Sequence, residues 1–486
     1  MPHKVFAATA LMTLLVSAAP AAEPLVLQDC RINAGAPFPS IKARCGVFLR
    51  PQNPEQPNGK MLELSVAVVA ALSLDPAPDP LVPIAGGPGQ GSSEFYASTY
   101  EAFEDIRRNR DIVLLDQRGT GDSARMDCDV DDDIVEGQMS AEQTRIATEA
   151  CLESLPHDPR FFTTTVAVGD LEALREALGY EQFNLYGISY GTRVAQHFAR
   201  RYPDSTRTVI LDGVVPPQLA LGPAIATEAQ RALDAIFARC AESESCAARY
   251  PNIAATFAEL EARISAESVT LTLPHPVTGA PEEVTFNEDQ LAGAIRLLSY
   301  HPSTVALIPF LVDAAAHGQF APLASQYLMI AGSLADSLSL GMHNAVMCTE
   351  DAPFFGGEGI SEEELGATYI GPMLVDALRT ICSVWPAGII DEDFKAPLRS
   401  DLPVLLLSGD ADPITPPGFA EIAAVDLSNY MHLIGKRQGH GQAPRGCMHE
   451  VMADFVEHAT VADLDTSCLE RQFAMPFFLD YSGPSP

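Results

Sequence analysis

A chain of 486 residues with 47% hydrophobic residues is long enough for one large domain or two and can bury a sizeable core. It carries 64 acidic residues against 30 basic ones, a formal net charge of −34 at pH 7. A surface this acidic repels nucleic acid and anionic lipid headgroups, so neither is expected as a partner.

The first residues have the pattern of a secretory signal peptide. A weakly basic start at His3 and Lys4 precedes an apolar run at 5–17 and a group of small residues. Ala-Pro-Ala at 19–21 fits the small-x-small cleavage pattern, so a signal peptide is predicted at 1–21. The apolar run is too short to span a bilayer comfortably and no later segment is long enough, so we expect no stable membrane insertion after cleavage.

Ten cysteines follow this segment, at positions 30, 45, 128, 151, 240, 246, 348, 382, 447 and 468. An even number in an exported chain indicates disulfides formed in an oxidising compartment, so we expect a periplasmic or secreted protein. The sequence does not determine the connectivity, and the simplest expectation is that neighbours in the chain pair. Because no Cys-x-x-Cys or close Cys/His cluster is present, no metal site is predicted.

Strands and helices alternate over the first part of the chain. Short apolar segments typical of strands lie at 46–49, 61–71, 81–85, 111–116, 182–186 and 207–211, and helical spacing occurs at 168–178 and 192–201. This alternation is typical of an α/β protein with a mostly parallel sheet covered by helices on both faces. It predicts the first part of a core over 22–215.

Between 216 and 399 the pattern changes to Ala-rich amphipathic segments. Helices are predicted at 224–241, 252–266 and 288–299, and a strand pair at 269–273 and 283–286. We predict a largely helical cap inserted over the sheet. Strands at 404–407 and 430–434 and helices at 418–425 and 446–458 then complete the core over 400–486.

A Gly-x-Ser-x-Gly motif at 187–191 lies between a predicted strand and a predicted helix. A sharp strand-to-helix turn exposes the central side chain, and its flanking glycines are needed because a larger side chain would collide. Free N–H groups at the helix start face whatever lies over the serine. Ser189 is therefore the predicted nucleophile of a serine hydrolase, against the alternative of a chance match in a Gly-rich loop.

A serine hydroxyl needs a base to take its proton, and the base needs a carboxylate to orient it. Asp410 and Asp412 follow one late strand, and His440, between two glycines, follows the next. Catalytic groups in such sheets gather at the carboxyl ends of strands. We predict Asp412 and His440 as partners of Ser189, preferring Asp412 because Pro413 rigidifies it, and expect Asp410 to cap a turn.

Two backbone N–H groups are needed for the oxyanion. Tyr190, which follows the nucleophile, supplies one, and Gly87 in the Gly-Gly-Pro-Gly turn at 86–89 is predicted to supply the other. A Gly-rich loop can also bind phosphate, but no Gly-Lys-Ser/Thr follows here. Arg118, in the loop after strand 111–116, and Asp170 are expected to be structural.

Together these motifs resemble the proline iminopeptidase and tripeptidyl aminopeptidase branch of the α/β-hydrolases. The matching segments cover most of the chain and lie at 86–89, 116–121, 187–192, 409–416 and 439–441. The C-terminal part, with Cys447 and Cys468 flanking a helix, looks like the tripeptidyl type. Many relatives carry His before the Gly-Gly-Pro-Gly turn; Ala85 stands there in this chain, which weakens a transfer of strict N-terminal proline specificity.

The resemblance implies an α/β-hydrolase fold and exopeptidase action, through an acyl-enzyme, on peptides with a free N-terminus, without a metal or organic cofactor. Such an enzyme must hold a free α-ammonium, usually with carboxylates of the cap. Glu350 and Asp351, in the segment 347–353 that looks like the family's Cys-x-x-Asp region, are the candidates for this substrate-binding role. Alternatively, they cap a helix end or pair within the cap. A bond between Cys348 and Cys382 would pin the segment.

Two other functions use the same fold. A cap-gated carboxylesterase acting on small acyl esters would need the same three residues and a different cap. A non-catalytic binding protein typically lacks one member of the triad, and here all three are present in the expected order. The sequence sets neither the number of residues released per turnover, nor the side-chain preference, nor the oligomeric state.

Overall fold

The computed structural model describes residues 25–486 apart from 36–37, 129–138, 275–277, 357–358 and 485–486. The predicted signal peptide lies outside the described residues. Among the residues described, no helix has the length and apolar character needed to cross a bilayer.

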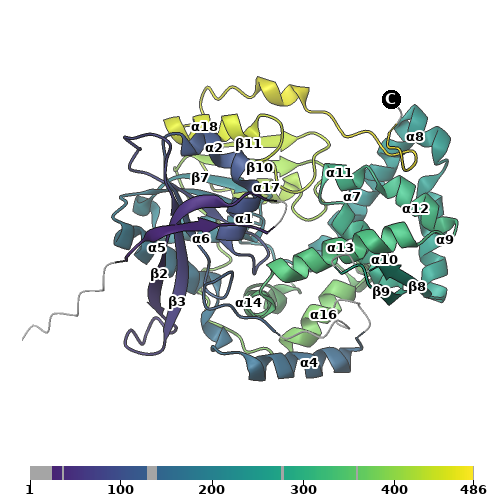
Figure 1. Ribbon diagram of the computed structural model, residues 1–486, viewed down its shortest axis with the longest axis horizontal. Coiled ribbons are helices and arrows are strands. Elements are labelled where there is room, and N and C mark those ends of the chain that lie inside the picture. The colour runs from purple at the N-terminus through teal and green to yellow at the C-terminus, as the bar shows by residue number, and fades with distance from the viewer. Residues whose placement is uncertain (1–24, 36–37, 129–138, 275–277, 357–358, 485–486) are drawn as a thin grey trace, which may run out of the picture.

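A nine-stranded sheet forms one half of the molecule (Figure 1). Its spatial order is β1 (Gln28–Ile32), β2 (Ile41–Pro51), β3 (Met61–Val69), β5 (Ile112–Leu115), β4 (Leu81–Ile84), β6 (Phe183–Ile188), β7 (Thr206–Asp212), β10 (Val404–Gly409) and β11 (Tyr430–Gly435). The strands from β5 to β11 pair in parallel, whereas β1, β2 and β3 join the sheet antiparallel. This confirms the predicted α/β fold with a mostly parallel sheet.

Both faces of the sheet are covered, because alternate residues of each strand point to opposite sides. Leu406 belongs to the cluster packed under α5 (Thr164–Leu178) and α6 (Tyr190–Arg201), while Leu405 and Leu407 belong to the cluster on the other face. That second cluster packs against α1 (Ser92–Thr99), α2 (Glu104–Arg107) and α18 (Met448–His458). Double coverage explains why the parallel strands have nearly continuous apolar sequences.

The elements from α7 to α13 form the other half of the molecule, on the right in Figure 1. We call the part from α7 to α13 the cap. It contains α7 (Pro223–Glu242), α8 (Glu244–Arg249), α9 (Ile253–Ala266), the hairpin β8 (Val269–Pro274) and β9 (Pro281–Phe286), α10 (Glu288–Leu298), α11 (Pro302–Val305), α12 (Ile308–Ala316) and α13 (Ala321–Ser337). These elements enclose their own hydrophobic core, which confirms a largely helical insertion.

The chain then returns towards the sheet. Met342 and Val346 of α14 (Leu340–Val346) are buried in the cluster beneath α5 and α6, so this helix packs with the sheet-bearing half. Short turns, α15 (Glu362–Gly366) and α16 (Met373–Cys382) follow, and α16 lies beside α4 (Ala141–Ser154) at the bottom of Figure 1. The domain boundaries at 216 and 399 stay a prediction.

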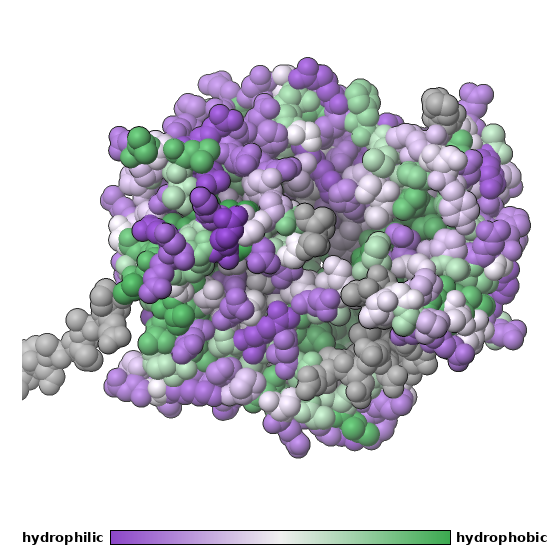
Figure 2. Space-filling model, viewed as in Figure 1, coloured by the Kyte–Doolittle hydropathy of each residue, from purple (hydrophilic) through white to green (hydrophobic). Residues whose placement is uncertain are grey.

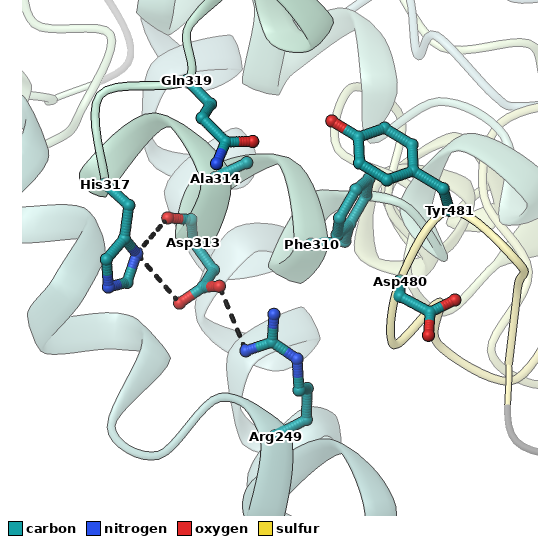
Figure 3. A pocket seen from close by; sticks show the side chains of 8 residues that line it. All are labelled: Arg249, Phe310, Asp313, Ala314, His317, Gln319, Asp480 and Tyr481. Atoms are coloured by element: carbon teal, nitrogen blue, oxygen red, sulfur yellow. Dashed lines mark hydrogen bonds and ion pairs between the residues drawn. The ribbon is translucent and has the colours of Figure 1, made fainter.

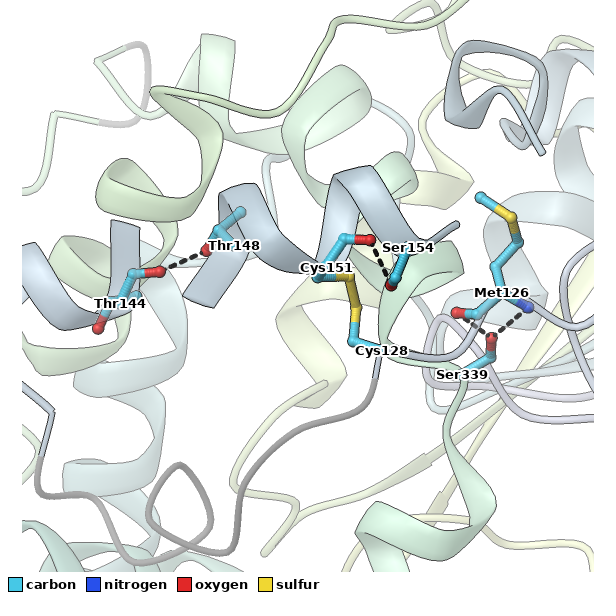
Figure 4. Close-up of a disulfide and its surroundings, with 7 residues drawn as sticks. All are labelled: Met126, Cys128, Thr144, Thr148, Cys151, Ser154 and Ser339. Carbon is cyan, nitrogen blue, oxygen red and sulfur yellow. Dashed lines mark hydrogen bonds between the residues drawn. A yellow bond between two sulfur atoms is a disulfide. The ribbon is translucent and has the colours of Figure 1, made fainter. Parts of the chain in front are cut away.

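All ten cysteines form disulfides, and each pairs with its neighbour in the chain, as expected. The bonds are Cys30–Cys45, Cys128–Cys151, Cys240–Cys246, Cys348–Cys382 and Cys447–Cys468. Figure 4 shows how Cys151 of α4 is joined to Cys128, close to the point where the Ser339 hydroxyl donates to the Met126 carbonyl at 2.7 Å. Five disulfides are typical of proteins that fold outside the reducing cytoplasm.

The last residues of the chain run back from α18 to the cap. The Phe478 N–H donates to the Ala306 carbonyl at 3.0 Å, and the Tyr250 hydroxyl donates to the Phe478 carbonyl at 2.9 Å. The Tyr481 and Phe310 rings meet edge to face, with their centroids 4.8 Å apart. Figure 3 shows this contact at the rim of a surface cavity of about 380 Å³ that cap and C-terminal residues share.

Candidate active site

Ser189 occupies the single residue that joins β6 to α6. Its backbone has φ +54° and ψ −126°, a conformation that residues with a side chain rarely adopt. A Cβ at Gly187 would lie 2.3 Å from the Gly191 carbonyl oxygen, and one at Gly191 would lie 2.3 Å from that of Ile84. Both flanking glycines are therefore required by the close approach of backbone, as the motif predicts.

The predicted oxyanion loop lies directly over the serine. A Cβ built on Gly86 would be 3.0 Å from Ser189 Cβ and 3.7 Å from its Oγ. Gly87 follows Gly86 in this loop with φ +107°, and Tyr190, the first residue of α6, follows Ser189 directly. Gly87 and Tyr190 stay the predicted N–H donors.

Asp412 and His440 meet at the carboxyl ends of β10 and β11. Asp412 Oδ2 accepts a hydrogen bond from His440 Nδ1 at 2.8 Å, and Asp412 is fully buried. Thr415, which the sequence did not single out, donates its hydroxyl to the same Oδ2 at 2.8 Å and lies 3.0 Å from His440 Nδ1. The backbone N–H groups of Ile414 and Thr415 donate to Oδ1, so the carboxylate is held from both sides.

Burial and the neighbouring charges shift the pKa values of Asp412 and His440 in opposite directions. Burial raises the pKa of Asp412, but His440 and the two backbone donors outweigh it, so its pKa lies below the usual value. For His440, burial lowers the pKa, yet the attraction of Asp412 and then of Asp212 leaves it above its usual 6.5. Asp412 therefore stays ionised while His440 is poised to take up a proton.

The end of β7 connects the nucleophile to the histidine. The Ser189 N–H donates to the Asp212 carbonyl at 2.9 Å, and a Cβ on the next residue, Gly213, would lie 2.9 Å from His440 Cε1. The structure thus brings Ser189, Asp412 and His440 to one edge of the sheet. No Ser189 Oγ–His440 hydrogen bond is formed among the described residues, and such bonds are often long in the free enzyme and tighten with substrate bound.

Asp212 is a site residue that the sequence analysis missed. Its buried carboxylate accepts the backbone N–H of Gln442 at 2.7 Å, the N–H of Ala443 at 2.8 Å and the hydroxyl of Tyr186 at 2.8 Å. It therefore fixes the turn that follows His440. Burial raises the pKa of Asp212, although these donors oppose the rise. Its only sequence signal is its place directly after an apolar strand and before a glycine.

The predicted ammonium anchor is closed off from solvent. Arg193 of α6 holds Asp351 in a two-pronged ion pair, with both N···O distances 2.8 Å, and Leu221 N–H donates to the same carboxylate at 2.7 Å. Glu350 accepts the backbone N–H of Thr164 at 2.7 Å and its hydroxyl at 2.9 Å. Both carboxylates are 0% exposed and bonded to groups of the protein, but these groups lie on α5, on α6 and before α7, and not within the cap. The substrate-binding role of Glu350 and Asp351 stays a prediction.

The same network lies beneath Tyr190, the predicted oxyanion donor. The Tyr190 hydroxyl is 2.6 Å from Thr164 Oγ1 and accepts from Gln117 Nε2 at 3.0 Å. Burial raises the pKa of Glu350 to about 7, against the opposing pull of Arg193 and Thr164. The side chain of Tyr190 is thereby tied to the segment that the Cys348–Cys382 disulfide pins to α16.

Three further polar residues have the structural roles that the sequence predicts. Arg118 is 1% exposed and binds both Asp170 oxygens, at 2.7 and 2.9 Å. Asp410, which was predicted to cap a turn and not to orient His440, accepts the backbone N–H of Arg437 and so caps the turn after β11.

A serine at a strained strand-to-helix turn, with a carboxylate-held histidine at the same edge of a mostly parallel sheet, is the arrangement of serine hydrolases. Residues 79–333 match the family model described as alpha/beta hydrolase fold. Residues 367–468 match a second model, described as TAP-like protein. The chain belongs to the α/β-hydrolase family.

Three individual relatives indicate which branch of the family the chain resembles. The chain is 25% identical over 448 residues to the serine protease Hip1 of Mycobacterium tuberculosis, covering 84% of this chain and 83% of that protein. It is 28% identical over 211 residues to a tripeptidyl aminopeptidase of Streptomyces coelicolor, covering 39% of this chain and 38% of that protein. A proline iminopeptidase of Xylella fastidiosa is 29% identical over 141 residues, 29% of this chain and 34% of that enzyme. These matches confirm the predicted family resemblance.

Proposed function

We propose that the protein is a secreted or periplasmic serine exopeptidase that releases N-terminal residues or short peptides, such as tripeptides, from peptides with a free N-terminus. The observation that carries the proposal is the buried Asp412–His440 pair beside Ser189 at its strained turn. The names of the relatives favour a peptidase over an esterase. The five disulfides and the predicted signal peptide favour an extracytoplasmic location.

The mechanism follows from the roles that these groups can take. Ser189 attacks the scissile carbonyl carbon while His440 takes the hydroxyl proton. The charge that develops on the carbonyl oxygen is stabilised by the backbone N–H groups of Tyr190 and Gly87. Asp412 fixes the tautomer of His440 and stabilises the imidazolium, which then protonates the leaving amine. Water, activated by the same histidine, hydrolyses the acyl-enzyme.

Steady-state hydrolysis of paired substrates tests this function. We expect turnover of Ala-, Pro- or Ala-Ala-Ala-p-nitroanilide with a free N-terminus, no turnover of the N-acetylated forms, and no activity in Ser189→Ala. The preferred length separates release of single residues from release of tripeptides. If p-nitrophenyl butyrate is hydrolysed and none of the peptides is, the protein is a carboxylesterase instead.

A matched pair of aspartates serves as the internal control. Asp412→Asn removes the acceptor that orients His440, so kcat should fall by about 10³–10⁴-fold. Asp410→Asn changes the same residue type two positions away, on the turn-capping carboxylate, and should leave kcat within a few-fold. Equal effects of the two substitutions would contradict the assigned roles.

A further inference from the structure

Arg296 of α10 reaches from the cap to the predicted catalytic histidine. Its Nη2 donates to the Tyr300 hydroxyl at 3.0 Å, and its guanidinium carbon lies 5.7 Å from the Tyr300 ring centroid. The Tyr300 ring in turn meets the His440 imidazole edge to face, with ring centroids 5.5 Å apart. The backbone N–H of His440 donates to the Tyr300 carbonyl at 2.8 Å. One aromatic ring therefore separates the guanidinium from the proposed base.

The guanidinium of Arg296 has no ion-pair partner. No carboxylate lies within 4.0 Å of it among the described residues, and although the side chain is only partly buried, its Nε is buried without a hydrogen-bond partner. Arg118 and Arg193 each form an ion pair with a buried carboxylate, although Arg193 Nε also lacks a partner. An N–H buried without an acceptor is costly, and a ligand that carries an acceptor can satisfy it.

The charge of Arg296 acts on the His343 imidazole and on two phenols. Burial lowers the pKa of His343, whose Nδ1 is 3.0 Å from the Pro88 carbonyl in the oxyanion loop, and Arg296 lowers it further. Burial raises the pKa of Tyr300 and of Tyr369, so both phenols stay protonated. The Tyr369 hydroxyl is also buried without a partner and feels the Arg296 charge. Tyr369, which lies between α15 and α16, therefore adds a second buried polar atom without a partner.

A ligand for this region has to be an anion with more than one acceptor atom. A guanidinium presents a planar fork of N–H donors that matches a carboxylate, and a phenol adds a further donor. Figure 2 shows the surface hollowed between the cap and the sheet-bearing half.

The chemistry of His440 indicates on which side of the scissile bond Arg296 would meet the substrate. Because His440 protonates the leaving amine, the leaving fragment lies against the histidine, on the side of Tyr300 and Arg296. A carboxylate at this place, within one or two residues of the scissile bond, is the C-terminus of a short peptide.

We propose that Arg296 binds the C-terminal carboxylate of the leaving fragment, so that the enzyme selects short peptides with a free C-terminus. The assignment rests on the proposed exopeptidase function and adds the substrate class to it. Arg296 is a substrate-binding residue and takes no part in bond cleavage.

The test compares tetra-alanine with its C-terminal amide, together with Ala-Ala-Ala-p-nitroanilide, which has no carboxylate. In the unsubstituted enzyme kcat/KM should be at least about 10-fold higher for the acid than for the amide, the factor expected of one charge-assisted hydrogen bond. Arg296→Gln should lower kcat/KM for the acid by about 10- to 100-fold. Its effect on the amide and the anilide, which offer no carboxylate, should be smaller and equal for both, so that the ratio of acid to amide hydrolysis falls.

Arg239 provides a matched control. It is another cap arginine with buried, unpartnered nitrogens, and it stacks on the Phe477 ring at 4.1 Å, but its charged neighbours are Arg437 and Asp410. Arg239→Gln should not change the ratio of acid to amide hydrolysis.

The outcomes separate the two proposals. Equal rates on acid and amide, or an equal loss on both in Arg296→Gln, would overturn the carboxylate assignment and leave the exopeptidase in place. Hydrolysis of none of the three peptides, nor of the Ala- and Pro-anilides, would overturn the exopeptidase function and the assignment with it.

Discussion

His440 illustrates how a single side chain is tuned by neighbours from different strands. Burial alone would lower its pKa, because an imidazolium is poorly solvated in a protein interior. Asp412 from the end of β10 and Asp212 from the end of β7 reverse that effect. Arg296, facing from the cap, works weakly in the opposite direction. The protonation of the base is therefore set jointly by the sheet and the cap.

This balance predicts the acid limb of the pH–rate profile. Only neutral His440 can accept the Ser189 proton, so kcat/KM should fall as the pH drops through the raised pKa, with a midpoint above pH 6.5. By linkage, the His440–Asp412 interaction stabilises the fold fully below the unfolded-state pKa and loses this contribution as the pH rises through the folded value. A kcat/KM profile on free peptide anilides measures the midpoint; a value below 6.5 would contradict the balance described.

At the scale of single elements, the turn between β6 and α6 shows how backbone contacts fix the nucleophile. The carbonyls of Gly191 and Ile84 come so close to the turn that no side chain fits at either flanking glycine. The helix then begins directly at Tyr190, which aims its first N–H groups at the space over Ser189.

Gly187→Ala should therefore abolish activity and lower the free energy of unfolding by several kcal/mol, since its Cβ would lie 2.3 Å from a carbonyl oxygen. Gly169→Ala in α5 is the control: its Cβ would meet only the Tyr202 hydroxyl, at 3.9 Å, inside a helix. There alanine should stabilise by about 0.5–1 kcal/mol. Thermal unfolding and anilide hydrolysis measure both; similar melting temperatures for the two variants would contradict the packing argument.

The elements that the sequence predicted well are those with a strong apolar period and a turn signal. The buried parallel strands and the loops that carry Ser189, Asp412 and His440 belong to this group. β1 escaped prediction because its sequence Gln-Asp-Cys-Arg-Ile is mostly polar and exposed. Asp212 and Thr415 escaped because their roles arise only where separate strand ends meet. The pairing of Arg193 with Asp351 joins positions 158 residues apart, and no local pattern encodes it.

Across the whole molecule, long-range ties hold the segment beneath the oxyanion residue. Cys348 and Cys382 close a loop of 34 residues that contains Glu350 and Asp351, and Trp385 packs against the disulfide in a small buried cluster. The ion pair to Arg193 ties the same segment to α6. The segment that follows the cap is thus held by a disulfide and tied to the sheet-bearing half by an ion pair.

Removing this disulfide, by Cys348→Ser together with Cys382→Ser, should lower the free energy of unfolding by about 3 kcal/mol through the greater freedom of the unfolded chain. Denaturant unfolding under oxidising conditions measures the change. The matched control removes Cys240–Cys246, whose loop spans only 6 residues and which should therefore matter less. A larger effect of the short-loop variant would contradict this view.

The return of the last residues to the cap has a consequence for biosynthesis. Asp412 and His440 lie in the final sixth of the chain, and the contacts of Phe478 and Tyr481 on the cap come later still. Neither the proposed catalytic set nor these contacts on the cap are complete until residues 412–481 have been made. A chain in the course of synthesis therefore lacks the proposed base until His440 has been added, and the proposed activity can begin only after that.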